Sequence, residues 1–70
     1  MALAERISSN IAEARRAAGL SQADLGFRLN TASQEISRLE SGRVVPRLTT
    51  LQRVARAIEV PLMDLLDGIE

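Results

Sequence analysis

Apolar residues recur every three or four positions along most of the chain, the spacing that gathers them on one face of an α-helix. The first stripe is followed by Gly19, which suits the left-handed conformation that ends many helices. The residues of this stripe are Leu3, Ile7, Ile11, Ala14 and Ala18. The pattern predicts a first helix over residues 4–18.

A second, shorter helix is predicted to begin after Ser21. Ser21 and Asp24 have the spacing of a capping box, in which each side chain accepts a hydrogen bond from a backbone N–H at the start of the helix. Leu25 and Leu29 form its apolar pair. Asn30 ends this helix because asparagine tolerates a positive φ.

A third helix is predicted over residues 32–41. Thr31 and Gln34 repeat the spacing of a capping box, so we expect their side chains to start it. Gly42 is its stop signal.

The last third of the chain predicts two more helices. Pro46 fixes a linker, and an apolar face follows over residues 48–58. Pro61 suits the first position of a last short helix, which ends before Gly68.

Strand signals are missing, so the pattern predicts an all-α fold of five short helices. We expect one domain over residues 1–70. Within it, two short helices joined through Asn30 would occupy about residues 21–41, and residues 48–70 would complete the core.

The composition excludes most catalytic chemistry. The chain has no histidine, cysteine, tyrosine or tryptophan, and all nine basic residues are arginine. Zinc sites of the usual kind, thiolate nucleophiles and disulfides are therefore excluded, and no neutral base is present to activate a serine. We expect a binding protein rather than an enzyme, with no metal and no cofactor.

The net charge of zero hides an uneven distribution. Residues 1–58 hold all nine arginines and five acids, whereas residues 59–70 hold the other four acids. A basic body of this kind favours a nucleic-acid partner, with the acidic tail placed away from it. The chain has no membrane-length apolar run and no signal-peptide pattern, so we expect a cytoplasmic protein without a membrane partner.

One side of the helix predicted over residues 32–41 is polar. At 100° per residue, Ile36, Leu39 and Glu40 share the opposite side. The polar side carries Gln34, Ser37, Arg38 and Ser41, with Ser33 at its border. Arginine and glutamine pair bidentately with guanine and adenine in a major groove, but the same residues also suit a solvated helix face.

Three groups of residues along the chain help to decide between these two interpretations of the helix over residues 32–41. The groups are Arg15 with Gly19-Leu20-Ser21-Gln22, then Leu25-Gly26 with Leu29, then Ile36-Ser37-Arg38-Leu39-Glu40-Ser41-Gly42 with Pro46. From Ile11 to Leu66, about four-fifths of its length, the chain resembles the lambda-repressor-like, Cro-type (XRE) helix-turn-helix family of transcriptional regulators. The resemblance implies a compact five-helix domain that binds double-stranded DNA. It places a helix-turn-helix over about residues 21–41, with residues 48–70 completing the core and supporting dimerisation.

The resemblance also implies roles for individual residues. The base-reading positions are Ser33, Gln34, Ser37 and Arg38. The positions that contact the DNA backbone or the minor groove are Gln22, Ser41, Arg43 and Arg47. Arg15 and Glu40 match an ion pair between the first helix and the end of the reading helix. The alternatives are that Gln22 caps its own helix and that Arg43 and Arg47 serve solubility; we expect Arg28, Arg53 and Arg56 to remain surface charges.

The chain departs from the family pattern at three positions. Ala32 stands where the family usually has a hydroxyl residue that caps the reading helix. Gly26 replaces the usual alanine, which costs helix propensity unless close packing requires a glycine. Glu59 stands at a glycine position, so we expect a strained turn after the fourth helix.

A single domain of this size reads few base pairs, so we expect a homodimer on a pseudo-palindromic operator. The candidate interface residues are Val44, Val45, Leu48, Met63, Leu66 and Ile69. The expected function is that of a repressor or autoregulating controller. The alternative is an antitoxin or interaction module that uses the same scaffold to dock a protein partner, such as a toxin or RNA polymerase.

Overall fold

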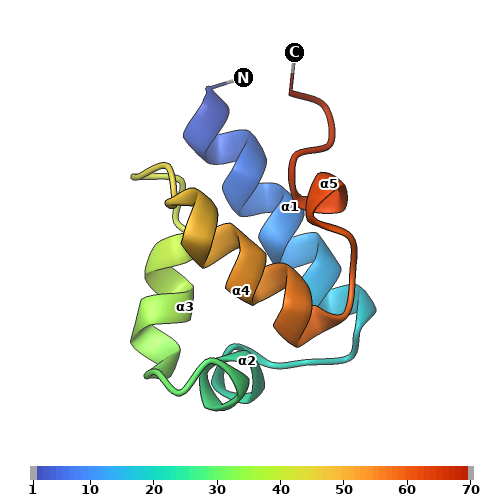
Figure 1. Cartoon of the computed structure of the whole chain (residues 1–70). Helices are drawn as coiled ribbons and strands as arrows, with labels where there is room; N and C mark the ends of the chain where they lie inside the picture. The colour runs from blue at the N-terminus through green and yellow to red at the C-terminus, as the bar shows by residue number, and fades with distance from the viewer. Residues whose placement is uncertain (1, 70) are drawn as a thin grey trace.

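Five helices connected by short loops make up the fold in this computed structural model, which describes residues 2–69. They are α1 (Leu3–Ala17), α2 (Gln22–Arg28), α3 (Ser33–Leu39), α4 (Leu48–Ile58) and α5 (Leu62–Leu65). Figure 1 shows α4 running in roughly the same direction as α1, with α2 at one end of the molecule. Over the described residues the prediction of an all-α fold with five helices is confirmed. No helix of this part of the chain has the length and apolarity to cross a membrane.

The core lies where the apolar faces of all five helices meet. Each helix contributes one side chain that is fully buried, and these are Ile11, Leu25, Ile36, Val54 and Leu65. Burial of such a side chain stabilises the fold by roughly 1.5–3 kcal/mol. The predicted apolar stripes therefore form the core, with three exceptions that remain exposed: Leu3 and Leu48 lie in first turns, and Ala18 lies at the end of α1.

Three helices end with a residue in the left-handed conformation, as expected for α1 and α2. Gly19, Asn30 and Glu59 have φ values of 75°, 56° and 65°. In each case the next residue donates its backbone N–H to a carbonyl five positions earlier, for example Val60 to Ala55 at 3.0 Å. Glu59, unlike glycine, has a side chain, and residues with a side chain disfavour this conformation. The strain expected after α4 is therefore present.

The helix starts agree with the sequence prediction only in part. The capping box of α2 is formed, with Asp24 N donating to Ser21 Oγ and Ser21 N to Asp24 Oδ2, both at 2.9 Å. The hydrogen bond from the Ser21 backbone N–H, together with the Ser21 hydroxyl, lowers the pKa of the Asp24 carboxyl below its ordinary value.

The capping box predicted at the start of α3 is wrong. The N-cap residue is Ala32, and no side chain caps this helix. The backbone N–H of Thr31, which a capping box would offer to the Gln34 side chain, instead closes α2 by donating to Gly26 O at 2.8 Å. Pro61 also lies one position earlier than predicted, at the N-cap of α5 rather than inside it.

Candidate nucleic-acid interface

The contact between α2 and α3 depends on Gly26. A Cβ atom at this position would lie 2.8 Å from the carbonyl oxygen of Thr31 and 3.3 Å from Ser33 N. Backbone therefore approaches backbone too closely for any side chain at residue 26. This close packing explains why a glycine, rather than the family's alanine, stands at position 26.

We predict that Gly26→Ala destabilises the protein by about 1–2 kcal/mol, although alanine favours helices. Overpacking costs roughly 1–3 kcal/mol, and the upper part of that range applies here because the added Cβ would meet backbone at 2.8 Å. The helix-propensity gain of about 1 kcal/mol offsets only part of this cost. Chemical denaturation would measure the change. Ala23→Gly, at an exposed position of the same helix, is the control for propensity alone. A Gly26→Ala protein as stable as the wild type would contradict the close approach.

The outward side of α3 carries the residues predicted to read bases. Ser33, Gln34, Ser37 and Arg38 are all exposed, whereas Ile36 points into the core. The Arg38 side chain is 65% exposed, and its ion pair with Glu35 is long at 3.4 Å. An exposed pair of this kind contributes little energy, so the guanidinium is available to another partner.

The inward side of the same helix is fixed by a charged network. Arg15 Nε donates to Glu40 Oε2 at 2.7 Å, and Arg15 Nη2 donates to Glu40 Oε1 at 3.0 Å. Gln22 Nε2 also donates to Glu40 Oε1, at 3.1 Å. The side chains of Arg15 and Glu40 are only 10% and 6% exposed. Residues from α1, α2 and the end of α3 therefore meet at one carboxylate.

The network shifts the pKa of both charged groups toward the charged form. Burial by itself raises the pKa of Glu40, but hydrogen bonds from Arg15 and Gln22 and the charges of Arg15 and Arg16 outweigh it, so the net pKa is lowered. The hydrogen bond to Glu40 raises the pKa of Arg15. Arg15 Nη1 also donates to Leu20 O at 2.9 Å, which ties the turn after α1 to the network.

Gln22 has a role that sequence reasoning missed. It does not cap its own helix, because Ser21 does so, and it donates one amide N–H to Glu40. A side-chain amide has two N–H groups, so one remains for a phosphate. The contact depends on how α2 sits against α3, and no local pattern encodes that arrangement.

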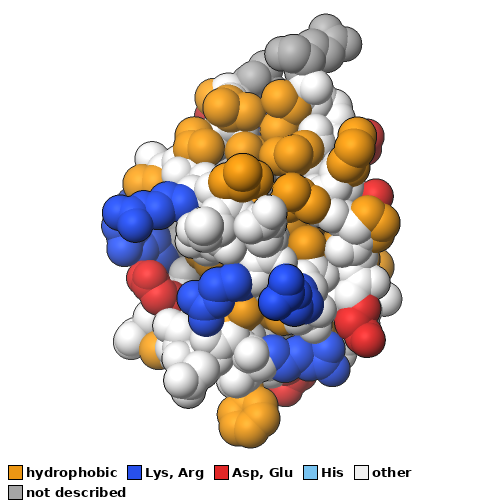
Figure 2. Space-filling view, in the orientation of Figure 1, with side chains coloured by type: hydrophobic (Ala, Val, Ile, Leu, Met, Phe, Trp, Pro, Cys, Tyr) orange, Lys and Arg blue, Asp and Glu red, His pale blue; other side chains and the backbone are white. Residues whose placement is uncertain are grey.

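The segment after α3 carries the remaining DNA-contact candidates. Ser41 Oγ donates to Arg38 O at 2.7 Å and accepts from Arg43 N at 3.3 Å, so its hydroxyl shapes the turn. Arg43 and Arg47 are exposed. Figure 2 shows arginine side chains distributed over the face that carries α3 and α4.

Two exposed arginines, expected to be surface charges, also join α2 to α4. Arg28 Nη1 donates to Ala57 O at 2.8 Å, and Arg53 Nη2 donates to Leu29 O at 2.8 Å. Both carbonyls belong to helix ends, where the backbone lacks partners within the helix and its dipole attracts cations. These reciprocal contacts hold the helix-turn-helix against α4.

The six candidate dimer residues fall into two groups. Val44, Val45, Leu48 and Met63 are exposed, and Met63 is 77% exposed. Leu66 and Ile69 are half-buried and pack against the core. Figure 2 shows an apolar patch on the half of this face away from α2.

Two features define a helix-turn-helix domain. The short helices α2 and α3 make close contact at Gly26, and α3 is held to the domain on its inward side while its outward side is polar. Residues 11–65 match the family model for the helix-turn-helix. The chain belongs to this family of DNA-binding transcriptional regulators.

Three curated relatives support the assignment. A helix-turn-helix transcriptional regulator of Sinorhizobium fredii, y4dJ, is 35% identical over 94% of this chain and 86% of its own length. Human endothelial differentiation-related factor 1 is 38% identical over 74% of this chain, and multiprotein-bridging factor 1 of Schizosaccharomyces pombe is 34% identical over 80%. The matched region spans only 35% and 38% of the latter two proteins.

Two solved structures share the fold. The clp gene regulator ClgR from C. glutamicum superposes with a TM-score of 0.88 at 23% identity, over 94% of this chain and 86% of that one. The restriction-modification controller protein C.AhdI from Aeromonas hydrophila gives a TM-score of 0.80 at 24% identity, over 87% and 88% of the two chains. At this level of identity, the likeness concerns the fold.

Proposed function

We propose that the protein is a sequence-specific regulator that binds a pseudo-palindromic operator as a homodimer in the cytoplasm, with α3 in the major groove. The observation that carries the proposal is the exposed polar side of α3, held from behind by the buried Arg15–Glu40 pair. A helix fixed in this way presents its side chains to DNA at little cost in ordering.

The proposed roles of the individual residues in DNA binding follow from the chemistry of their side chains. Arg38 pairs with guanine O6 and N7, and Gln34 pairs with adenine N6 and N7. Ser33 and Ser37 contribute single hydrogen bonds to nearby base edges. The residues that position the domain on phosphates or in the minor groove are Gln22, Ser41, Arg43 and Arg47.

The salt dependence of DNA binding tests the proposed charged surface. Each protomer would neutralise about three phosphates, so a dimer's log affinity is expected to fall against log salt with a slope near −5. Arg28 and Arg53 are left out of this count because they bind backbone carbonyls. The measurement is an anisotropy titration with labelled DNA from upstream of the gene, in excess non-specific competitor. A slope near zero would contradict the proposal.

The proposed homodimer uses the exposed apolar residues between α3 and α4 and on α5. We predict that Met63→Asp abolishes the dimer, because it places a charge in an apolar contact, and lowers DNA affinity more than about tenfold. The fold is retained, since Met63 is largely exposed.

Sedimentation and circular dichroism would follow assembly and fold together. Phe27→Asp is the matched control for sedimentation, because Phe27 is an exposed apolar side chain on α2. A wild-type monomer, or a Met63→Asp protein that remains dimeric, would contradict this interface.

A further inference from the structure

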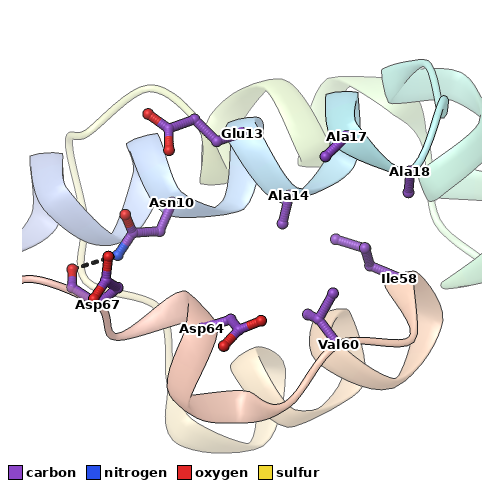
Figure 3. A pocket seen from close by; sticks show the side chains of 9 residues that line it. All are labelled: Asn10, Glu13, Ala14, Ala17, Ala18, Ile58, Val60, Asp64 and Asp67. Carbon is purple, nitrogen blue, oxygen red and sulfur yellow. Dashed lines mark hydrogen bonds between the residues drawn. The ribbon is translucent and has the colours of Figure 1, made fainter.

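A groove runs between the second half of α1 and the segment that leads from α4 through α5 (Figure 3). Its volume is about 430 Å³. None of the residues that line it belongs to α2 or α3. The groove is therefore separate from the proposed DNA-reading surface.

The floor of the groove is apolar and shallow. Ala14, Ala17 and Ala18 contribute small side chains from α1, and Ile58 and Val60 form the facing wall (Figure 3). Small residues spaced three and four apart on one helix allow another helix to approach closely. The floor therefore has the shape that receives a helix with medium-sized apolar side chains.

The groove is held in shape by Asn10 at one end. Asn10 Nδ2 donates to Leu65 O at 3.0 Å and to Asp67 O at 2.9 Å. These two hydrogen bonds fasten the end of α5 to α1, and Asn10 itself is buried. A preformed groove of this kind binds a partner with less ordering cost than a flexible one.

The charged residues that line the rim of the groove are all acidic, and the Arg6 guanidinium lies just beyond them, beside Gly68. Glu13 stands on the α1 side, and Asp64 and Asp67 stand on the other side. No arginine is among the lining residues. Such a rim repels DNA phosphates and attracts a cationic partner.

We propose that this groove docks a cationic amphipathic helix of a partner protein. The apolar face of that helix packs on the three alanines, Ile58 and Val60, while its arginines or lysines pair with Glu13 on one edge and Asp64 and Asp67 on the other. Charge complementarity favours this occupant over an acidic segment. Because the groove and α3 share no residues, one protomer can hold DNA and this partner together.

The test uses the full chain, isotope-labelled for NMR, and a synthetic helical peptide with leucine on one face and arginines along both edges of that face. Amide shifts are expected at Ala14, Ala17 and Val60. The double variant Asp64→Asn with Asp67→Asn should weaken binding about tenfold or more by calorimetry. Ala17→Arg should abolish binding, since Ala17 is exposed and tolerates a larger side chain without unfolding. Glu35→Gln, which removes an acid on α3, should leave the affinity unchanged.

Several outcomes would overturn the proposal. They are no binding of the peptide, equal binding of a peptide with glutamates in place of the arginines, and shifts confined to another surface. Loss of the homodimer in Ala17→Arg, measured by sedimentation, would show that a second copy of this chain covers the groove instead. The effects of Met63→Asp and Arg38→Ala on DNA binding test only the proposed DNA-binding function. The docking proposal and the proposed function can therefore be contradicted independently.

Discussion

Replacing Glu40 by alanine is expected to lower the free energy of unfolding by about 3 kcal/mol. The change leaves the Arg15 guanidinium buried without its carboxylate, and breaking a buried pair in this way typically costs roughly 3–5 kcal/mol. The low end applies because Arg15 keeps its hydrogen bond to Leu20 O. The same change also removes the acceptor of the Gln22 amide. The end of α3 then keeps the hydrogen bond from Ser8 Oγ of α1 to Leu39 O, at 2.8 Å.

Thermal or chemical denaturation measures this loss, and Glu35→Ala is the matched control. Glu35 also pairs with an arginine, but its side chain is 49% exposed, so the control is expected to lose less than about 1 kcal/mol. If Glu40→Ala cost less than about half a kcal/mol, the pair would not be desolvated.

The difference in the free energy of unfolding between the wild type and Glu40→Ala depends on pH because the pKa of Glu40 is lowered. A carboxyl group whose pKa is lower in the folded state than in the unfolded state stabilises the fold fully above its ordinary value of 4.5. This contribution is lost as the pH falls through the folded-state pKa. The stability gap between wild type and Glu40→Ala should therefore be constant near neutrality and shrink in acid.

Arg38→Ala is expected to produce the largest loss in DNA affinity without loss of stability. A bidentate arginine–guanine contact contributes about 1–3 kcal/mol of discrimination, which is about five- to 150-fold in affinity for each protomer. A dimer makes the contact twice, so the combined loss exceeds that of one site. The fold should be unaffected, because Arg38 is exposed and its pair with Glu35 is weak.

Titration of both proteins with the same operator DNA measures this effect. Arg56→Ala is the control, because it removes an exposed arginine of α4 outside the proposed reading face. Its affinity should change little. Equal losses for Arg38→Ala and Arg56→Ala would mean that arginine charge, rather than base contact, accounts for the binding.

Local signals explain which parts of the fold were predictable. The apolar stripes and the Ser21–Asp24 capping box involve residues within one or two helical turns, and both appear as expected. The capping box at Thr31 failed because Thr31 N–H was already committed to closing the previous helix. The residue spacing that predicts a capping box does not show whether a neighbouring helix already uses the same N–H.

Contacts between elements account for the rest. The Arg28 and Arg53 contacts with helix-end carbonyls depend on the placement of α2 against α4, and arginines at such positions read as ordinary surface charges. The groove beside α1 is likewise formed by residues far apart in sequence, from Asn10 to Asp67. In the sequence, the small and acidic residues of this groove lie in separate segments, so no local pattern shows that they form one surface.

Selection of random-sequence DNA by the full chain tests the central claim most directly, namely that the polar side of α3 reads bases. The wild type should enrich a pseudo-palindromic motif with half-sites about one helical turn apart, and Arg38→Ala should relax the preference at one guanine in each half-site. Enrichment of no motif by the wild type, or of the same motif with the same strength by Arg38→Ala, would contradict that claim.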